Sequence, residues 1–170
     1  MSKIVAFSVP SLEDGETALK ELESAEEVKD VALVYKNEKG RVKIRQTSDL
    51  TLGKGAVRGG LLGAAVGLFA GPLVGAAAVG AAGGGALAAL GARGVDNKVM
   101  KLAGQQLEVG HAAVFVLAGD AEADAIAKKL EALSHLKQFD GVIEVGEFPE
   151  DAQKLVKEHI KLENEGVLAG

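Results

Sequence analysis

A glycine row with a period of four residues constrains this chain more than any other feature. Glycine recurs at every fourth position for six places, at Gly55, Gly59, Gly63, Gly67, Gly71 and Gly75. After Pro72 a second row of small residues runs one position out of phase and includes Gly80 and Gly84. A spacing of four places small residues along one stripe of a helix, where another helix backbone can approach closely. We therefore predict that residues 53–93 form a glycine-zipper helical hairpin, bent at Pro72, in which these eight glycines mediate self-association.

The same segment is apolar but only weakly hydrophobic. From Gly59 to Ala92 there are 34 residues without a charged or hydrogen-bonding side chain: 11 Gly, 12 Ala, one Pro and ten Leu, Val or Phe. The ten larger residues contribute roughly −3 to −6 kcal/mol to membrane insertion, and Gly and Ala add little. About 25 Å of helix before Pro72 and about 31 Å after it suffice for two short spans or a shallower re-entrant hairpin. Close helix–helix packing must supply the remaining stabilisation.

Other interpretations of this segment stay open at the level of sequence. A flexible Gly/Ala linker would lack a period and would contain Ser, Asn or charged residues, so the strict spacing disfavours it. A signal anchor is a stronger alternative than a linker. So is a hairpin buried inside a soluble assembly, which the low hydropathy favours.

Basic residues lead into the glycine row. Lys36 to Arg58 contains seven basic and two acidic residues, a local charge of +5 in a chain whose net charge is −5. A basic segment beside an apolar one is typical of contact with anionic lipid headgroups, and the overall acidity disfavours nucleic-acid binding. The residues predicted to contact headgroups, or alternatively to form a solvated surface, are Arg41, Lys43, Arg45, Lys54, Arg58 and Arg93.

Outside residues 53–93, short strand patterns alternate with amphipathic helix patterns. Strands are predicted at 3–9, 31–35, 41–47, 111–118 and 141–148, and helices at 12–25, 95–107, 122–136 and 149–163. The segments 5–34 and 114–145 repeat the order strand, helix, strand at nearly the same length. Two such halves predict an α+β, ferredoxin-like split βαβ sheet with both helices on one face. Residues 1–52 and 94–170 are thus predicted to form one domain, and residues 53–93 an insertion.

No group of residues indicates a reaction centre. The chain has no cysteine, and His111, His135 and His159 stand on separate elements without metal-ligand spacing. Lys54 is followed by glycine, which breaks the phosphate-binding P-loop pattern, and neither a dinucleotide motif nor Gly-x-Ser-x-Gly occurs. With one Tyr and no Trp, base stacking is poorly supported. We therefore expect no enzymatic activity and no cofactor.

The N-terminal residues do not resemble a secretory signal, because Pro10 and acidic residues interrupt the apolar run early. Arg58 and Arg93 bracket the apolar segment, which favours both of its ends lying on the cytoplasmic side of a membrane. The predicted location is the cytoplasmic face of the cell membrane, or the cytoplasm.

Four motifs along the chain carry a resemblance to a known family. They are QTSDLT at 46–51, the glycine row with its Gly-Pro-Leu at 71–73, DNKVMKL at 96–102 and GHAAVFVL at 110–117. In this order they resemble the bacterial family called domain of unknown function 1269, whose members are described as membrane proteins. The chain departs from the family pattern at Asn97, usually an acid, and at Val109, usually a proline. The resemblance implies membrane association and supplies no catalytic residue.

These observations favour a non-enzymatic, self-assembling, membrane-associated protein, with a second copy of itself and membrane lipid as its partners. The glycine hairpins would pack against one another in or on the bilayer. One alternative is a soluble homo-oligomer or filament whose hairpins bury one another. Another is a regulatory ligand-binding module, an idea that rests on fold analogy alone.

Overall fold

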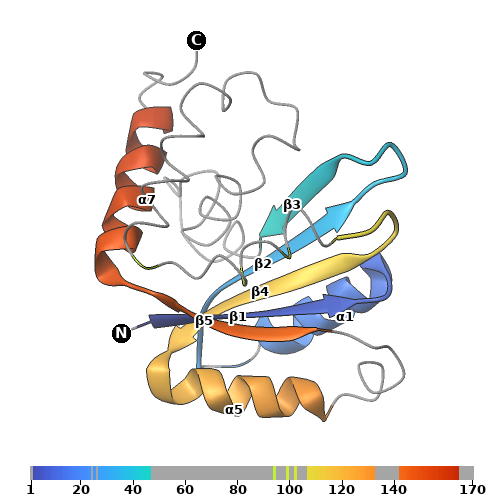
Figure 1. Cartoon of the computed structure of the whole chain (residues 1–170), viewed down its shortest axis with the longest axis horizontal. Helices are drawn as coiled ribbons and strands as arrows, with labels where there is room; N and C mark the ends of the chain where they lie inside the picture. The colour runs from blue at the N-terminus through green and yellow to red at the C-terminus, as the bar shows by residue number, and fades with distance from the viewer. Residues whose placement is uncertain are drawn as a thin grey trace.

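Two nearly continuous apolar runs become neighbouring strands at the centre of the fold. The computed structural model describes residues 2–23, 25, 27–46, 94, 99, 102, 107–132 and 142–164. In order, the elements are β1 (Ser2–Val9), α1 (Leu12–Glu23), β2 (Val28–Lys36), β3 (Val42–Gln46), β4 (Ala112–Gly119), α5 (Asp120–Glu131), β5 (Ile143–Phe148) and α7 (Glu150–Asn164), shown in Figure 1. The described residues are thus α+β, as the sequence predicts. The predicted insertion 53–93 lies outside them.

The five strands form one antiparallel sheet in the order β3-β2-β4-β1-β5. β1 pairs with β4 on one side and with β5 on the other, so Val5 lies opposite both Val116 and Val145. β2 pairs with β4 and with β3, which places β3 and β5 at the two margins of the sheet. Because β3 precedes and β4 follows residues 47–93, strands from both sides of that segment share one sheet.

Helices α1 and α5 pack on the same face of the sheet, as predicted from their apolar stripes (Figure 1). Alternate residues of the three central strands meet the inward stripes of the two helices in one hydrophobic core, which includes Val5, Phe7, Leu33, Val114, Ala123 and Ile126. At the start of α1 the Ser11 hydroxyl accepts a hydrogen bond from Asp14 N and donates one to its carboxylate. This reciprocal cap satisfies a backbone donor that the first helical turn leaves open.

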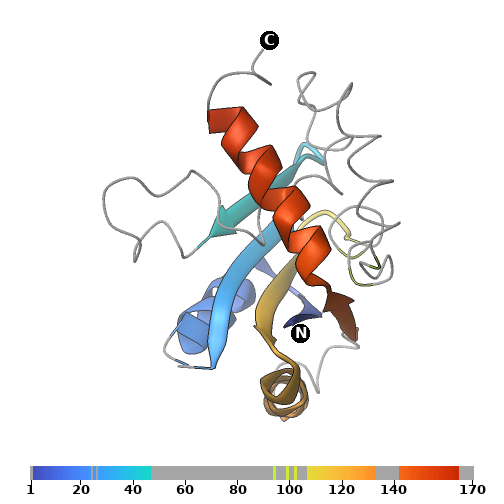
Figure 2. The same cartoon turned by 90° about the vertical axis from the view of Figure 1, so that its left-hand side faces the viewer.

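The opposite face of the sheet is also apolar and buried. Phe115 lies at its centre, and the register places Ala6 of β1 and Ala32 of β2 on either side of it. Helix α7 lies on this side of the sheet, with Ala152 and Val156 buried, as Figures 1 and 2 show. Both faces of the sheet are covered. The central strands are therefore apolar at every position, and apolar and polar residues do not alternate along them.

Several boundaries differ from the sequence prediction for local reasons. β2 begins at Val28, before the predicted start, because an irregularity in the register between Val28 and Asp30 admits a charged pair into the strand. α5 begins at Asp120 because Gly119 is both the last residue of β4 and the N-cap, so no loop separates them. Of the helix predicted at 95–107, Val99 and Leu102 are helical and buried, and the other described residue, Leu107, is buried outside a helix.

No helix among the described residues combines the length and the apolar composition that crossing a bilayer requires.

Gly15 lets α1 lie close to the sheet. A Cβ built at this position would be 2.6 Å from Leu33 Cδ1 and 3.3 Å from Ala112 Cβ. The Leu33 methyl is the end of a side chain and can yield to one extra carbon, whereas a larger side chain must displace the helix.

Replacing Gly15 with valine is therefore expected to lower the free energy of unfolding by about 1–3 kcal/mol through overpacking. Urea unfolding followed by circular dichroism measures the change. Lys20→Val is the matched control, since Lys20 is exposed in the same helix and its replacement introduces the same β-branched residue. Helix propensity alone favours valine over glycine, so a loss in Gly15→Val no larger than in Lys20→Val would show that the close approach does not set the cost.

Candidate functional site

The hairpin that joins β2 to β3 is held by a single asparagine. Asn37 Oδ1 accepts hydrogen bonds from the backbone N–H of Lys39 at 3.0 Å and of Arg41 at 2.9 Å. Gly40 N donates to Asn37 O at 2.9 Å, and Asn37 N donates to Arg41 O at 2.9 Å. Gly40 has φ of +73°, as expected for the last residue of a three-residue hairpin loop. The backbone of the turn is therefore fixed without help from the charged side chains.

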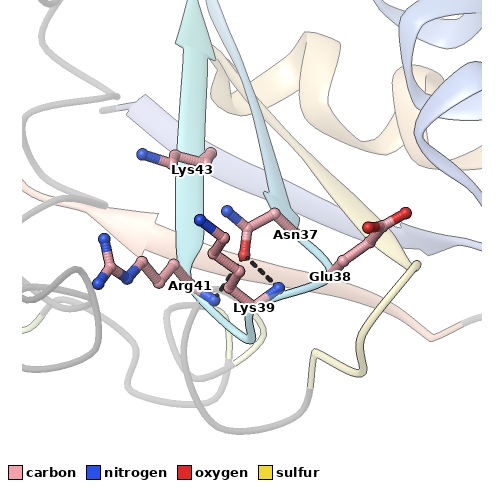
Figure 3. A pocket seen from close by; sticks show the side chains of 5 residues that line it. All are labelled: Asn37, Glu38, Lys39, Arg41 and Lys43. Carbon is pink, nitrogen blue, oxygen red and sulfur yellow. Dashed lines mark hydrogen bonds between the residues drawn. The ribbon is translucent and has the colours of Figure 1, made fainter.

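This turn gathers three cations at one end of the sheet. Lys39, Arg41 and Lys43 are all exposed, and together with Asn37 and Glu38 they line a shallow hollow of about 350 Å³. Figure 3 shows the Glu38 carboxylate pointing away from Lys43 and Arg41. The three basic groups therefore face solvent without an acid between them. We refer to Lys39, Arg41 and Lys43 as the basic tip.

Two other described lysines, Lys3 and Lys129, have acidic partners, unlike the basic tip. Lys3 Nζ lies 2.8 Å from Asp120 Oδ1, and this hydrogen-bonded pair raises the pKa of Lys3 and lowers the pKa of Asp120. Lys129 Nζ lies 3.3 Å from Glu27 Oε2. Within the part of the chain that the structure describes, no carboxylate lies in ion-pair range of the basic tip.

A second loop lies against the base of the hairpin. Gly110 N donates to Lys36 O at 3.2 Å, and Lys36 Nζ donates to Leu107 O at 2.8 Å. These bonds hold Val109, 55% exposed, at the same end of the sheet as the basic tip. An exposed valine and three exposed cations thus lie at one end of the sheet, a combination that suits the boundary between lipid headgroups and acyl chains.

Charge is separated across the domain. Helix α1 carries five acidic residues and one basic residue, and α5 carries four acidic and two basic residues. Both helices pack on one face, whereas the basic tip extends from the β3 margin. The domain therefore has an electric asymmetry that can orient it at a charged surface.

The structure places only some of the residues that the sequence singled out. Arg41 and Lys43 lie together at the hairpin, and Arg45 follows them in β3, although its side chain is outside the described part. Lys54, Arg58 and Arg93 fall outside the described residues, as do Pro72 and the glycines Gly55, Gly59, Gly63, Gly67, Gly71, Gly75, Gly80 and Gly84. The predicted contacts of these residues stay predictions.

Sequence reasoning missed Lys39, Val109 and the role of Asn37. The run Asn-Glu-Lys-Gly, with Asn first and Gly fourth, signals the turn, but the turn signal by itself does not assign Lys39 to the candidate site. The position of Val109 had no local signal, because it depends on the pairing of β2 with β4.

The arrangement is suited to binding anions. Three flexible cations at a fixed turn can meet several phosphate oxygens at once, each through charge and N–H donors. Among the described residues, no group of three or more His, Asp or Glu side chains is placed to hold a metal ion.

Comparison with known proteins identifies one family. The family model described as "Protein of unknown function (DUF1269)" matches residues 56–161, more than half of the chain. No curated protein and no solved structure matches the chain. The matched range begins in the glycine row and continues through β4, α5 and β5 into α7. The chain therefore belongs to the DUF1269 family of proteins of unknown function.

Proposed function

We propose that this protein is a non-enzymatic, self-assembling protein of the cytoplasmic membrane face. In this proposal the basic tip binds anionic lipid headgroups, and the glycine-zipper segment 53–93 packs against its counterparts from other copies in or on the bilayer. The observation that carries the proposal is the cluster of three exposed cations on a backbone-fixed turn, without a carboxylate partner among the described residues. The cluster lies on the hairpin whose second strand leads toward the glycine row.

The attraction from the basic tip is weak and reversible by itself. Each lysine or arginine near an anionic membrane surface contributes about 1 kcal/mol, so the basic tip contributes about 3 kcal/mol. The acidic helices α1 and α5 are repelled by the same surface, which favours an orientation with the hairpin toward the lipid. The turn is already fixed by Asn37, so binding orders only the side chains.

The fold supports the proposed domain division. Without β3, the strand order is β2-β4-β1-β5, and in each βαβ half the two parallel strands are separated by a strand from the other half. This is the order expected of a ferredoxin-like split sheet, to which β3 adds an edge strand. We assign residues 1–52 and 94–170 to this domain and residues 53–93 to the inserted hairpin.

The insertion supplies self-association in this proposal. Its ten Leu, Val and Phe residues favour insertion only weakly, so the small stripe must provide helix–helix contact to hold it at the membrane. Glycine is also costly in a solvated helix, by about 1 kcal/mol each relative to alanine. Both arguments favour a segment whose helices meet other helices.

Replacing Gly63 and Gly67 with leucine tests this part of the proposal. The larger side chains separate the helices, so we expect a smaller assembly and lower recovery in membrane fractions, measured by sizing and by vesicle flotation. The two leucines also make the segment more hydrophobic, which by itself should increase membrane recovery. A decrease in recovery would therefore indicate that helix packing is lost. Ala65→Leu, which lies off the glycine row, is the control.

If oligomer size and flotation are unchanged in the Gly63/Gly67 variant, the proposal that the glycine row mediates self-association is wrong. Purification of the wild-type chain without detergent as one large, uniform assembly would instead favour the soluble homo-oligomer.

A further inference from the structure

The margin of the sheet formed by β5 presents backbone groups with which no other described residue pairs. Ser8 N donates to Val142 O at 3.0 Å, and the register continues along the strands as Ala6 with Glu144 and Ile4 with Gly146. In an antiparallel pair such residues exchange hydrogen bonds at every second position. The N–H and C=O groups of Ile143, Val145 and Glu147 therefore point away from β1, toward the open side of β5.

No other described backbone group pairs with this open side of β5. Val145, in the middle of the strand, is 37% exposed, and Val142 just before it is 42% exposed. An uncovered strand with an apolar centre is a template for pairing with another strand. Figure 2 shows β5 at the margin of the sheet opposite to β3.

We propose that two copies of this chain pair through their β5 strands, antiparallel and about a two-fold axis at Val145, to form one continuous sheet. The contact is isologous, so it closes as a dimer and does not extend into a fibre. This proposal concerns a surface of the described domain and is independent of the glycine zipper and of lipid binding.

The sequence of β5 complements itself in this register. With Val145 opposite Val145 of the second copy, Ile143 lies opposite Glu147 and Glu144 lies opposite Gly146. All three outward-facing residues then find partners, giving about six backbone hydrogen bonds. No carboxylate lies directly opposite another, and the two valines form an apolar contact on the axis.

Neighbouring registers are less favourable. Moving the axis to Glu144 or to Glu147 places a glutamate directly opposite its own copy, which is repulsive. Moving it to Gly146 places Pro149, which has no N–H, opposite Ile143 and removes hydrogen bonds. Charge and backbone chemistry therefore select the axis at Val145.

The other margin is poorly suited to self-pairing. In β3 the residues whose backbone groups face outward are 42, 44 and 46. The backbone of Arg41 faces β2, since Asn37 N donates to Arg41 O and Arg41 N donates to Asn37 Oδ1, and the direction alternates from there along the strand. An axis at Ile44 would place Lys43 opposite the arginine at position 45. Like charges directly opposite are destabilising, and lysine on an edge strand is a common protection against pairing. The β3 margin, with the basic tip, stays available for lipid at both ends of the dimer.

A single cysteine at position 145 tests the proposal in the full chain. The wild type has no cysteine, so Val145→Cys introduces one reactive thiol. Hydrogen-bonded partners in an antiparallel pair have Cα atoms about 5.5 Å apart, inside the range that a disulfide spans. Under mild oxidation we expect covalent dimers on non-reducing gels, with about ten-fold higher yield than for Val109→Cys, which is more exposed but distant from β5.

A second variant tests the same contact without a cysteine at position 145, in case that cysteine disturbs the strand. Val145→Pro removes an outward N–H and leaves the hydrogen bonds to β1 intact, so it should abolish the dimer contact without unfolding the domain. The register places position 143 opposite position 147 of the second copy, so a mixture of Ile143→Cys and Glu147→Cys chains should cross-link, and Val145→Pro in both chains should reduce that cross-linking to the level of Val109→Cys. Equal cross-linking at 145 and 109, or none at 145 in folded protein, would overturn the proposal.

Discussion

Replacing Phe115 with alanine is expected to lower the free energy of unfolding by about 3–5 kcal/mol. Phe115 is fully buried on the central strand β4, and Ala6 and Ala32 lie beside it on the neighbouring strands. Because both lateral neighbours are already as small as alanine, they cannot fill the space that the ring leaves. The loss therefore includes a cavity in addition to the lost transfer free energy.

Urea unfolding monitored by circular dichroism measures this change. Val109→Ala is the control, because its exposed side chain should alter stability by no more than about 0.5 kcal/mol. If Phe115→Ala does not fold, Phe115→Leu should still show a smaller loss in the same direction. A loss below about 1 kcal/mol for Phe115→Ala would mean that the second face of the sheet is not the packed layer described above.

Neutralising the basic tip is expected to weaken binding to anionic vesicles by about 100-fold. The variant Lys39→Gln, Arg41→Gln, Lys43→Gln removes three cations, each worth about 1 kcal/mol near an anionic surface. The fold should be unaffected, because Asn37 holds the turn through backbone N–H groups that the variant keeps. Vesicle co-sedimentation across lipid concentrations gives the affinity.

A second triple variant separates position from net charge. Lys20, Lys128 and Lys157 are exposed on the three helices, and their replacement with glutamine changes the net charge by the same amount. We expect this variant to bind nearly as well as the wild type. Raising the salt concentration should bring the wild type toward the basic-tip variant, since screening removes the same attraction. Equal weakening in both triple variants would indicate a response to overall charge alone.

Most strands and helices of the domain followed from local sequence patterns, whereas some of their boundaries depended on tertiary pairing. The apolar runs at the start of the chain and after residue 111 predicted buried strands, and the repeated order of elements predicted α1 and α5 on one face. The irregularity that admits Lys29 and Asp30 into β2 had no such signal, because two charged residues beside a turn look like a loop. Tertiary pairing overrode that local preference.

In the candidate site, too, some features follow from local sequence patterns and others depend on tertiary pairing. Alternation in β3 predicted Arg41 and Lys43 on one exposed side, and both are exposed. That Val109 stands at the same end required the pairing of β2 with β4, which joins residues more than seventy positions apart in the chain. The open β5 margin also depends on strand order, so no property of the segment 143–148 by itself could have indicated it.

Fluorescence quenching by lipid tests the central claim, that the basic tip contacts anionic lipid, most directly. Glu38→Cys places a fluorophore at the hairpin, and Ala121→Cys places one on an exposed residue just past the other end of β4. Vesicles carry lipids with a nitroxide quencher, with or without anionic headgroups. We predict strong quenching at position 38 with anionic vesicles, little with zwitterionic vesicles, and little at position 121 with either. Equal quenching at both positions, or none at position 38 while the protein floats with anionic vesicles, would contradict the account.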